Sequence, residues 1–193
     1  MSVKVIKKFP DVNDFTYNYR EWNRQFIEQN VILNGKYSYL YYPAHWTTLS
    51  FKFAFGGNEQ YIFDRMKYNV NDDSFLILNR DTIYESLIDS DISVESFTMN
   101  FTEKFTDDVF YSCFNSDEYL LDFPELRDRK PVNFFQKLYP NDDVVRFYVR
   151  ELRNLSSVHS PDQNRINEVM HNILEYIFRL QLSLSKEADT INS

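Results

Sequence analysis

The sequence contains little glycine: Gly35, Gly56 and Gly57 are the only three among 193 residues. A dinucleotide-binding fingerprint needs three spaced glycines. A P-loop needs two, followed by lysine and then serine or threonine, because only glycine lets backbone amides close on a phosphate. Neither arrangement occurs. The sequence therefore excludes these two kinds of nucleotide-binding site.

Cysteine and histidine are also scarce. Cys113 is the only cysteine, so the chain can form neither an internal disulfide nor a multi-cysteine zinc site, and we expect a buried thiol in a reducing compartment. The histidines are His45, His159 and His171, and they lack the His-x-His and His-Glu-x-x-His spacings that bring two imidazoles to one metal. We therefore expect no metal and no cofactor.

Long apolar runs and an excess of basic charge are absent as well. The N-terminal stretch has no segment long enough for a signal peptide or a membrane span, which predicts a cytoplasmic protein without membrane contact. With 21 basic and 29 acidic residues the net charge is −8. A basic face is needed to replace the counterions of nucleic acid phosphates. We therefore expect no direct DNA contact by this chain.

Motifs for catalysis are missing too. There is no Gly-x-Ser-x-Gly elbow for a serine nucleophile. The carboxylate pairs Asp72-Asp73, Asp107-Asp108 and Asp142-Asp143 fall at segment boundaries, where turns and helix caps account for them. The sequence therefore predicts no catalytic residues and no enzyme.

Residues 31 to 101 are dominated by apolar and polar side chains that alternate with period two, the pattern of half-buried strands. A change of parity at Asp64-Arg65 predicts a hairpin turn, and the run 75–78 is apolar on both faces, as in a central strand. The predicted strands cover 37–41, 49–55, 61–63, 66–70, 75–78, 83–88 and 92–101. We expect a mostly β fold, a sandwich or barrel.

Helical spacing flanks this region. The pattern predicts two helices after Tyr139-Pro140, over 142–154 and from Pro161 to Leu184, and an amphipathic helix within 17–32. The second C-terminal helix has an apolar arc of about 200°, about twice what one domain face needs. We expect a homodimer whose seam is formed by Ile166, Met170, Ile173, Ile177 and Leu180. The alternative is a helix deeply buried in its own domain.

Aromatic residues make up 18% of the chain and often alternate along the predicted strands, so many of them should line a barrel interior. Tyrosine hydroxyls can supply the few polar contacts of a small-ligand pocket. The predicted ligand-binding residues are Tyr39, Tyr41, His45, Lys52, Phe53 and Tyr84. For His45 a packed, hydrogen-bonding role is the alternative. A slip of one residue in a strand would reverse the inward face.

Several motifs resemble the N-terminal cupin-like domain of AraC-family transcription regulators. They are Pro43-x-His45-Trp46, Leu49-Ser50-Phe51-Lys52, Gly57-x-Glu59-x-Tyr61, Tyr68-x-Val70-x-x-Asp73-x-Phe75-Leu76-Ile77-Leu78-Asn79 and Val94-Glu95-Ser96-Phe97-x-x-x-Phe101. The chain departs from the family pattern at Asp72-Asp73, where Pro-Gly is common, and it lacks the C-terminal helix-turn-helix region. Without matching histidines, the resemblance implies a metal-free barrel.

The resemblance implies four segments: an N-terminal arm or helix over 1–30, a cupin-like double-stranded β-helix or jelly-roll barrel over 31–140, a two-helix dimerisation segment over 141–185, and a linker over 186–193 toward a missing DNA-binding domain. The implied function is effector sensing and dimerisation, with a small-molecule effector and DNA contacted by that missing domain. Two alternatives stay open. One is a metal-free cupin-fold enzyme acting on a sugar or small acid, and the other is a structural module with a solidly packed barrel.

Overall fold

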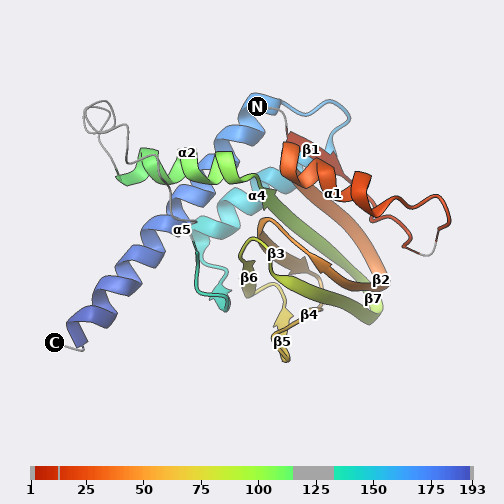
Figure 1. The fold of residues 1–193 in the computed structure, drawn as a ribbon, viewed down its shortest axis with the longest axis horizontal. Helices are drawn as coiled ribbons and strands as arrows, with labels where there is room; N and C mark the ends of the chain where they lie inside the picture. The colour runs from red at the N-terminus through yellow and green to blue at the C-terminus, as the bar shows by residue number, and fades with distance from the viewer. Residues whose placement is uncertain (1–2, 13, 115–132, 192–193) are drawn as a thin grey trace.

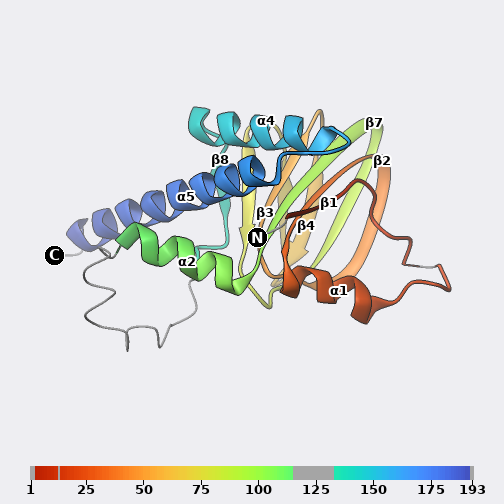
Figure 2. The same ribbon diagram turned by 90° about the horizontal axis from the view of Figure 1, so that it is seen from above.

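An eight-stranded sheet forms the centre of the fold, and helices cover one of its faces (Figures 1 and 2). The computed structural model describes residues 3–12, 14–114 and 133–191. The elements are β1 (Val3–Ile6), α1 (Tyr19–Glu28), β2 (Asn30–Trp46), β3 (Leu49–Phe55), β4 (Glu59–Phe63), β5 (Met66–Val70), β6 (Ser74–Leu78), β7 (Ile83–Phe101), α2 (Glu103–Phe114), β8 (Leu138–Pro140), α4 (Asp143–Ser157) and α5 (Gln163–Ile191). This confirms the predicted class, a mostly β fold followed by C-terminal helices.

Two long antiparallel strands, β2 and β7, organise the sheet. The order is β1-β2-β7-β3-β6-β8, and β4 pairs with both β5 and β7. β1 runs parallel to β2, whereas the other pairs are antiparallel. β7 pairs with β2 along nearly its whole length, with β3 through its second half and with β4 through its first half, so this one strand belongs to both parts of the folded sheet.

The predicted hairpin is confirmed, but one predicted strand break is wrong. Asp64 and Arg65 have φ angles of 51° and 64°, the left-handed values of a two-residue hairpin turn between β4 and β5. The strands predicted over 83–88 and 92–101 are one continuous strand, β7. Asp89-Ser90-Asp91 lies beside a change of register in the pairing with β2, so the polar residues mark a bulge instead of a turn.

The helices begin largely where the sequence predicts. α4 starts after Asp142, whose Oδ1 accepts a hydrogen bond of 2.9 Å from the backbone N–H of Val145. α1 lies within the predicted range but ends at Glu28, because the chain enters β2 at Asn30. β1 and α2 are additional elements. α5 continues to Ile191, into the predicted linker, whose residues 192 and 193 lie outside the described residues.

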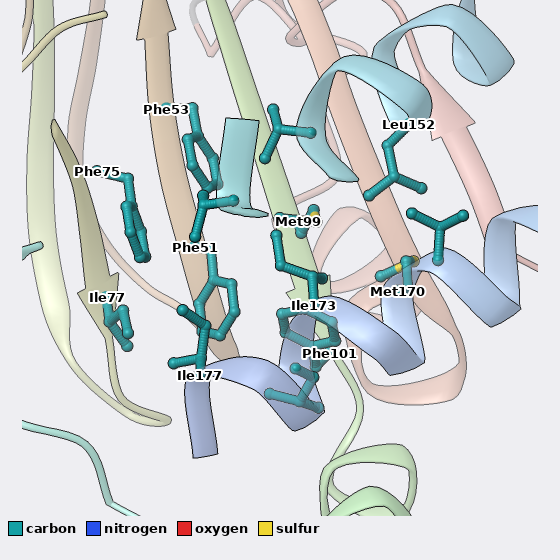
Figure 3. Close-up of a cluster of buried hydrophobic side chains, with 14 of the residues drawn as sticks. Phe51, Phe53, Phe75, Ile77, Met99, Phe101, Leu152, Met170, Ile173 and Ile177 are labelled. Atoms are coloured by element: carbon teal, nitrogen blue, oxygen red, sulfur yellow. The ribbon is translucent and has the colours of Figure 1, made fainter. Parts of the chain in front are cut away.

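The main hydrophobic core lies between the sheet and α2, α4 and α5 (Figure 3). Ile166, Met170, Ile173 and Ile177 have 0% exposure, and the partly buried Leu180 packs against the same cluster. In Figure 3, Ile173 and Ile177 lie against Phe51 and other side chains of the sheet. These residues serve the core of their own domain, so the predicted dimer seam is wrong and the alternative of a helix buried in its own domain holds.

The α5 arc is wide because three neighbours cover it. α5 packs against the sheet, α2 and α4. Phe178 of α5 lies 5.3 Å from Phe110 of α2 between ring centroids, and Tyr176 donates a 2.7 Å hydrogen bond to Asp142 beside α4. A helix that contacts elements on several sides needs an apolar surface wider than one stripe. The chain itself therefore accounts for the 200° arc.

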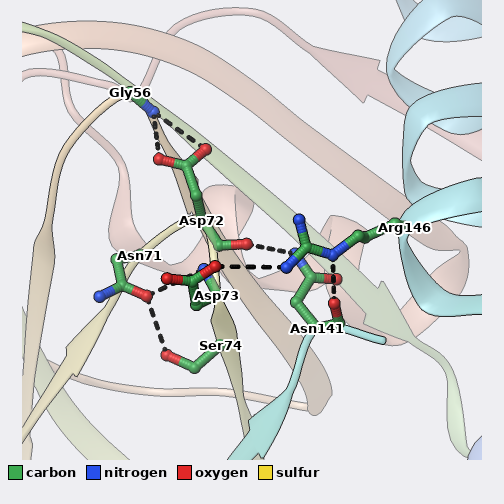
Figure 4. Close-up of polar contacts among 7 residues, drawn as sticks. All are labelled: Gly56, Asn71, Asp72, Asp73, Ser74, Asn141 and Arg146. Atoms are coloured by element: carbon green, nitrogen blue, oxygen red, sulfur yellow. Dashed lines mark hydrogen bonds and ion pairs between the residues drawn. The ribbon is translucent and has the colours of Figure 1, made fainter. Parts of the chain in front are cut away.

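The unusual Asp72-Asp73 pair connects the β5–β6 turn to the start of α4 (Figure 4). The carboxylate of Asp72 accepts a 3.1 Å hydrogen bond from the backbone N–H of Gly56, and its carbonyl accepts one of 3.0 Å from Asn141 Nδ2. Arg146 Nη2 lies 3.3 Å from Asp73 Oδ1, and its Nε donates to the Asn141 carbonyl. Asp72 and Asp73, which stand where the family commonly has Pro-Gly, thus hold the start of α4 against the barrel.

Candidate functional site

Alternation along β3 places Lys52 inside the barrel. Phe51 and Phe53 point into the core shared with the helices, so Lys52 and Ala54 point the opposite way. The inner face also receives Tyr61, Tyr84 and other members of a second buried cluster from β4, β6 and β7. Lys52 has only 2% exposure. A buried ammonium group needs polar partners, and their identity defines the site.

Lys52, Tyr84 and His45 form the centre of this site. The Lys52 ammonium donates a 2.7 Å hydrogen bond to the Tyr84 hydroxyl and lies 4.5 Å from the centroid of the same ring. The His45 ring packs against Tyr84 in a tilted arrangement, with 4.2 Å between centroids, and meets Tyr42 edge-on at 4.6 Å. Nδ1 of His45 lies 2.7 Å from the Pro43 carbonyl and donates to it, which leaves Nε2 as an acceptor.

Glu59 supplies a buried carboxyl group in the same interior. It has 1% exposure, and the hydroxyls of Ser96, Tyr61 and Ser86 lie near enough to favour its ionised form. Among the described residues, no hydrogen bond of good geometry reaches its Oε2 atom. The charge of Lys52 also stabilises the carboxylate. The barrel interior therefore holds one acid and one base that influence each other.

Burial shifts the pKa of each of these groups in the direction that favours its neutral form. Loss of hydration lowers the pKa of Lys52 to about 7, although the nearby Glu59 carboxyl opposes the change. Burial lowers the pKa of His45 to about 4, so this ring is neutral at physiological pH. Burial also raises the pKa values of Glu59 and Tyr84. The interior is thus only weakly charged near neutral pH.

A small cavity of about 20 Å³ lies beside His45 and Tyr84. Its lining residues are Phe9, Trp22, Asn23, Phe26, Leu33, Tyr42, His45, Trp46, Thr47, Thr48, Tyr84 and Asn100. Asn23 and Asn100 are more than nine-tenths buried, yet the Nδ2 groups of both lack a hydrogen-bond partner among the described residues. Such a volume holds about one water molecule or one small polar group. The cavity therefore offers two unused amide donors to an acceptor atom.

The N-terminal arm and α1 cover this cavity. Phe9 packs against Tyr37 and Tyr42 with ring centroids 5.8 and 5.7 Å apart, and its backbone N–H donates a 2.8 Å hydrogen bond to the Tyr37 hydroxyl. The hydroxyls of Tyr17 and Tyr42 lie 3.1 Å apart. Phe9, Tyr17 and α1 therefore close this side of the barrel interior.

A larger groove of about 840 Å³ adjoins the cavity on its outer side. Phe26, Trp46 and Thr48 line both spaces, so these three side chains separate the groove from the cavity. The groove lies between α1 and the start of α2, with Leu49 and Phe101 among its apolar lining. A shift of Phe26 or Trp46 would join the two spaces.

The structure brings together three of the six predicted ligand residues: His45, Lys52 and Tyr84. Tyr39 and Tyr41 lie on the outer face with 66% and 48% exposure, so their predicted inward orientation is wrong. A change of register between Tyr37 and Tyr39 reverses the parity of β2.

Phe53 is also misplaced by the prediction, because adjacent strand residues such as Lys52 and Phe53 point to opposite faces. Sequence reasoning missed Tyr42, Glu59, Asn23 and Asn100. The Gly57-x-Glu59-x-Tyr61 motif was the feature of the sequence that could have identified Glu59.

Neither a metal-binding group of side chains nor a membrane-spanning helix occurs among the described residues. No group of three or more histidine, cysteine, aspartate or glutamate side chains among them could hold a metal ion. Within the same ranges, no helix is long and apolar enough to cross a membrane.

Comparison with known proteins identifies a similar fold. No protein-family model matches the sequence, and no curated protein matches it. Apo ToxT K231A from Vibrio cholerae aligns with a TM-score of 0.50 and 14% identity, over 84% of this chain and 57% of that chain. ToxT bound to an unsaturated fatty acid aligns with a TM-score of 0.47 and 12% identity, over 78% and 54% of the two chains.

A third ToxT structure, bound to (E)-4-(8-methylnaphthalen-1-yl)but-3-enoic acid, aligns with a TM-score of 0.48 and 13% identity, over 79% of this chain and 55% of that chain. The chain therefore spans a little over half the length of ToxT. ToxT is an AraC-family regulator, so the predicted resemblance is confirmed at the level of the fold.

Proposed function

We propose that this chain is the effector-sensing and dimerisation domain of an AraC-type transcription regulator in the cytoplasm, with DNA contacted by a separate helix-turn-helix domain. The fold shared with part of ToxT supports this assignment. The coding sequence beyond Ser193 tests the second half of the proposal, which expects a helix-turn-helix region there. A different kind of domain in that place would contradict it.

The observation that carries the sensing role is the cavity with two unused amide donors. An effector that places a carboxylate, carbonyl or hydroxyl oxygen there can accept hydrogen bonds from Asn23 and Asn100. The aromatic rings of Tyr42, His45 and Tyr84 supply apolar walls, as small-ligand sites require. We infer an organic effector with a polar end and an apolar body.

The size of the cavity implies that binding moves α1. About 20 Å³ admits one polar group, so the body of a larger effector must occupy the adjoining groove of about 840 Å³. Displacing Phe26 from between the two spaces shifts α1 and the arm that packs on Tyr37 and Tyr42. The solved ToxT complexes hold organic acids with apolar bodies, which matches this shape of effector.

A thermal-shift panel tests the sensing role. The purified chain is mixed with carboxylic acids and matched alcohols of increasing chain length, and we expect saturable stabilisation by one class. Asn100→Ala and Asn23→Ala should abolish it, whereas Asn69→Ala on the exposed β5 should not. Equal stabilisation in all variants would place the ligand elsewhere. The absence of any binding would favour the structural module with a packed barrel.

We propose that the dimer interface lies on α4, because the predicted seam residues of α5 pack in the core of their own domain. Val144 and Phe147 are 40% and 50% exposed and lie three positions apart, so they share one helix face. A second copy would bury these side chains. Light scattering should show a dimer at tens of micromolar and a folded monomer for Val144→Asp with Phe147→Asp. The control Val158→Asp should stay dimeric. A monomeric wild type would refute the interface.

A metal-free enzyme is the second candidate, favoured by the group formed by Lys52, Tyr84, His45 and Glu59. An amine whose pKa is about 7, 2.7 Å from a phenol, is suited to general base chemistry. Mass spectrometry of a bound compound after incubation separates the two functions. A sensor returns the compound unchanged, whereas an enzyme converts it and Lys52→Met stops the conversion.

A further inference from the structure

A second groove, of about 550 Å³, lies between the C-terminal half of α4 and the strands β2 and β7, and it shares no lining residue with the cavity beside His45. Four basic side chains line it: Lys7, Lys36, Arg150 and Arg153. Glu95 is the only acidic residue in its lining. In a chain with a net charge of −8, this groove concentrates positive charge.

Arg153 is held in a fixed position at the groove. Its Nε and Nη2 atoms donate hydrogen bonds of 2.9 and 2.6 Å to the two carboxylate oxygens of Glu95. Its guanidinium carbon also lies 3.9 Å from the centroid of the Phe55 ring. A guanidinium has five N–H donors in a rigid fork, so Nη1 keeps donors for another acceptor.

Glu95 is an ionised carboxylate whose negative charge is paired with the cations around it. Burial alone would raise its pKa, but the hydrogen bonds and charge of Arg153 and the charge of Lys36 bring the pKa below its usual value. The Lys36 ammonium lies 4.0 Å from Oε2 and its side chain is 70% exposed. The single acid therefore orients the cations without cancelling the positive charge of the groove.

The other cations keep donors for a ligand. Lys7 Nζ donates one 3.1 Å hydrogen bond to the Ser157 carbonyl, which leaves two of its three N–H groups. Arg150 is exposed and forms no ion pair within the described ranges. Asn34, Asn154 and Ser157 add neutral polar groups to the lining. Cations that converge on one concave surface with polar neighbours favour an oxyanion.

We propose that this groove binds the phosphate-type oxyanion of a soluble small molecule, a site separate from the effector cavity and independent of the proposed function. The volume of about 550 Å³ falls in the range of small-molecule sites. Four cations in a recess on an acidic protein do not provide the extended basic face that duplex DNA requires. A bound anion would also link α4 to β2 and β7.

Inorganic pyrophosphate is the probe for this site. Calorimetric titration at low salt should show saturable binding to the wild type, and raised salt should weaken it. Lys36→Gln with Arg150→Gln should weaken binding by about tenfold or more. The control Arg20→Gln with Lys67→Gln removes the same charge from exposed positions elsewhere and should leave affinity unchanged. Circular dichroism checks that both double variants are folded.

Three results would overturn the proposal. No saturation by pyrophosphate means that the groove binds no oxyanion of this class. Equal weakening in both double variants means that only the overall charge matters. Displacement of pyrophosphate by short duplex DNA, lost in Lys36→Gln with Arg150→Gln, would make the nucleic acid backbone the ligand. Binding by the wild type and the control alone, without competition from DNA, supports the site.

Discussion

The variant Lys52→Met removes a buried ammonium and keeps a side chain of similar length. Lys52 has an ordinary pKa of 10.5 in the unfolded chain and a pKa of about 7 in the folded one. Since one pKa unit corresponds to about 1.4 kcal/mol, burying the charged form costs about 5 kcal/mol. The variant loses the hydrogen bond to Tyr84, which contributes about 1 kcal/mol. We therefore expect Lys52→Met to be more stable than the wild type in mild acid.

The gain should shrink as the pH rises. Below pH 7 Lys52 is protonated in both states, so the wild type carries the whole cost. Between pH 7 and 10.5 the unfolded chain binds more protons, so the stability of the wild type increases with pH. Glu59, whose pKa burial raises, loses its cationic neighbour in the variant, which lowers the stability of the variant at higher pH. Both effects reduce the difference.

Urea denaturation at two pH values measures this difference. Between about pH 6 and about pH 9.5 the advantage of Lys52→Met over the wild type should fall by about 3 kcal/mol. Tyrosine ionisation affects both proteins alike and cancels in the comparison. Lys67→Met on the exposed β5 strand is the control and should show no such dependence. A constant difference between Lys52→Met and the wild type would refute the burial of Lys52 as the cause.

Three other substitutions test the fold. Ile173→Ala should lower the free energy of unfolding in urea by about 2–5 kcal/mol, because it leaves a cavity in the core, whereas Val158→Ala at an exposed position should change it by less than about 0.5 kcal/mol. Arg65→Gly should raise the free energy of unfolding, measured by thermal denaturation, by about 1 kcal/mol, because a residue with a side chain is strained at a φ of 64°. Asp142→Ala should cost about 1–2 kcal/mol in urea denaturation, because the cap of α4 and the bond from Tyr176 are lost; an unchanged midpoint would contradict this role.

Local chemistry determined much of this fold from the sequence alone. The parity change at Asp64-Arg65 predicted the β4–β5 hairpin. Across a two-residue turn, paired residues such as Tyr61 and Tyr68 face the same side, although one position is odd and the other even. Asp142 predicted the start of α4, because its carboxylate can accept from the free N–H groups of the first turn. These features depend on residues a few positions apart, so their patterns can be read along the chain.

Tertiary packing decided which residues form the candidate site. A register change in the pairing of β2 with β7 turned Tyr42 inward and Tyr39 outward, and this offset depends on the partner strand. Asn23 and Asn100 meet at one cavity although 77 positions separate them (100 − 23), so no local pattern links them.

The apolar arc of α5 also has two readings in the sequence, a core helix or a dimer helix. Hydrophobic periodicity records how wide a buried surface is, but not which element buries it, because the hydrophobic effect has no direction. The fold assigned that surface to the sheet, α2 and α4 of the same chain.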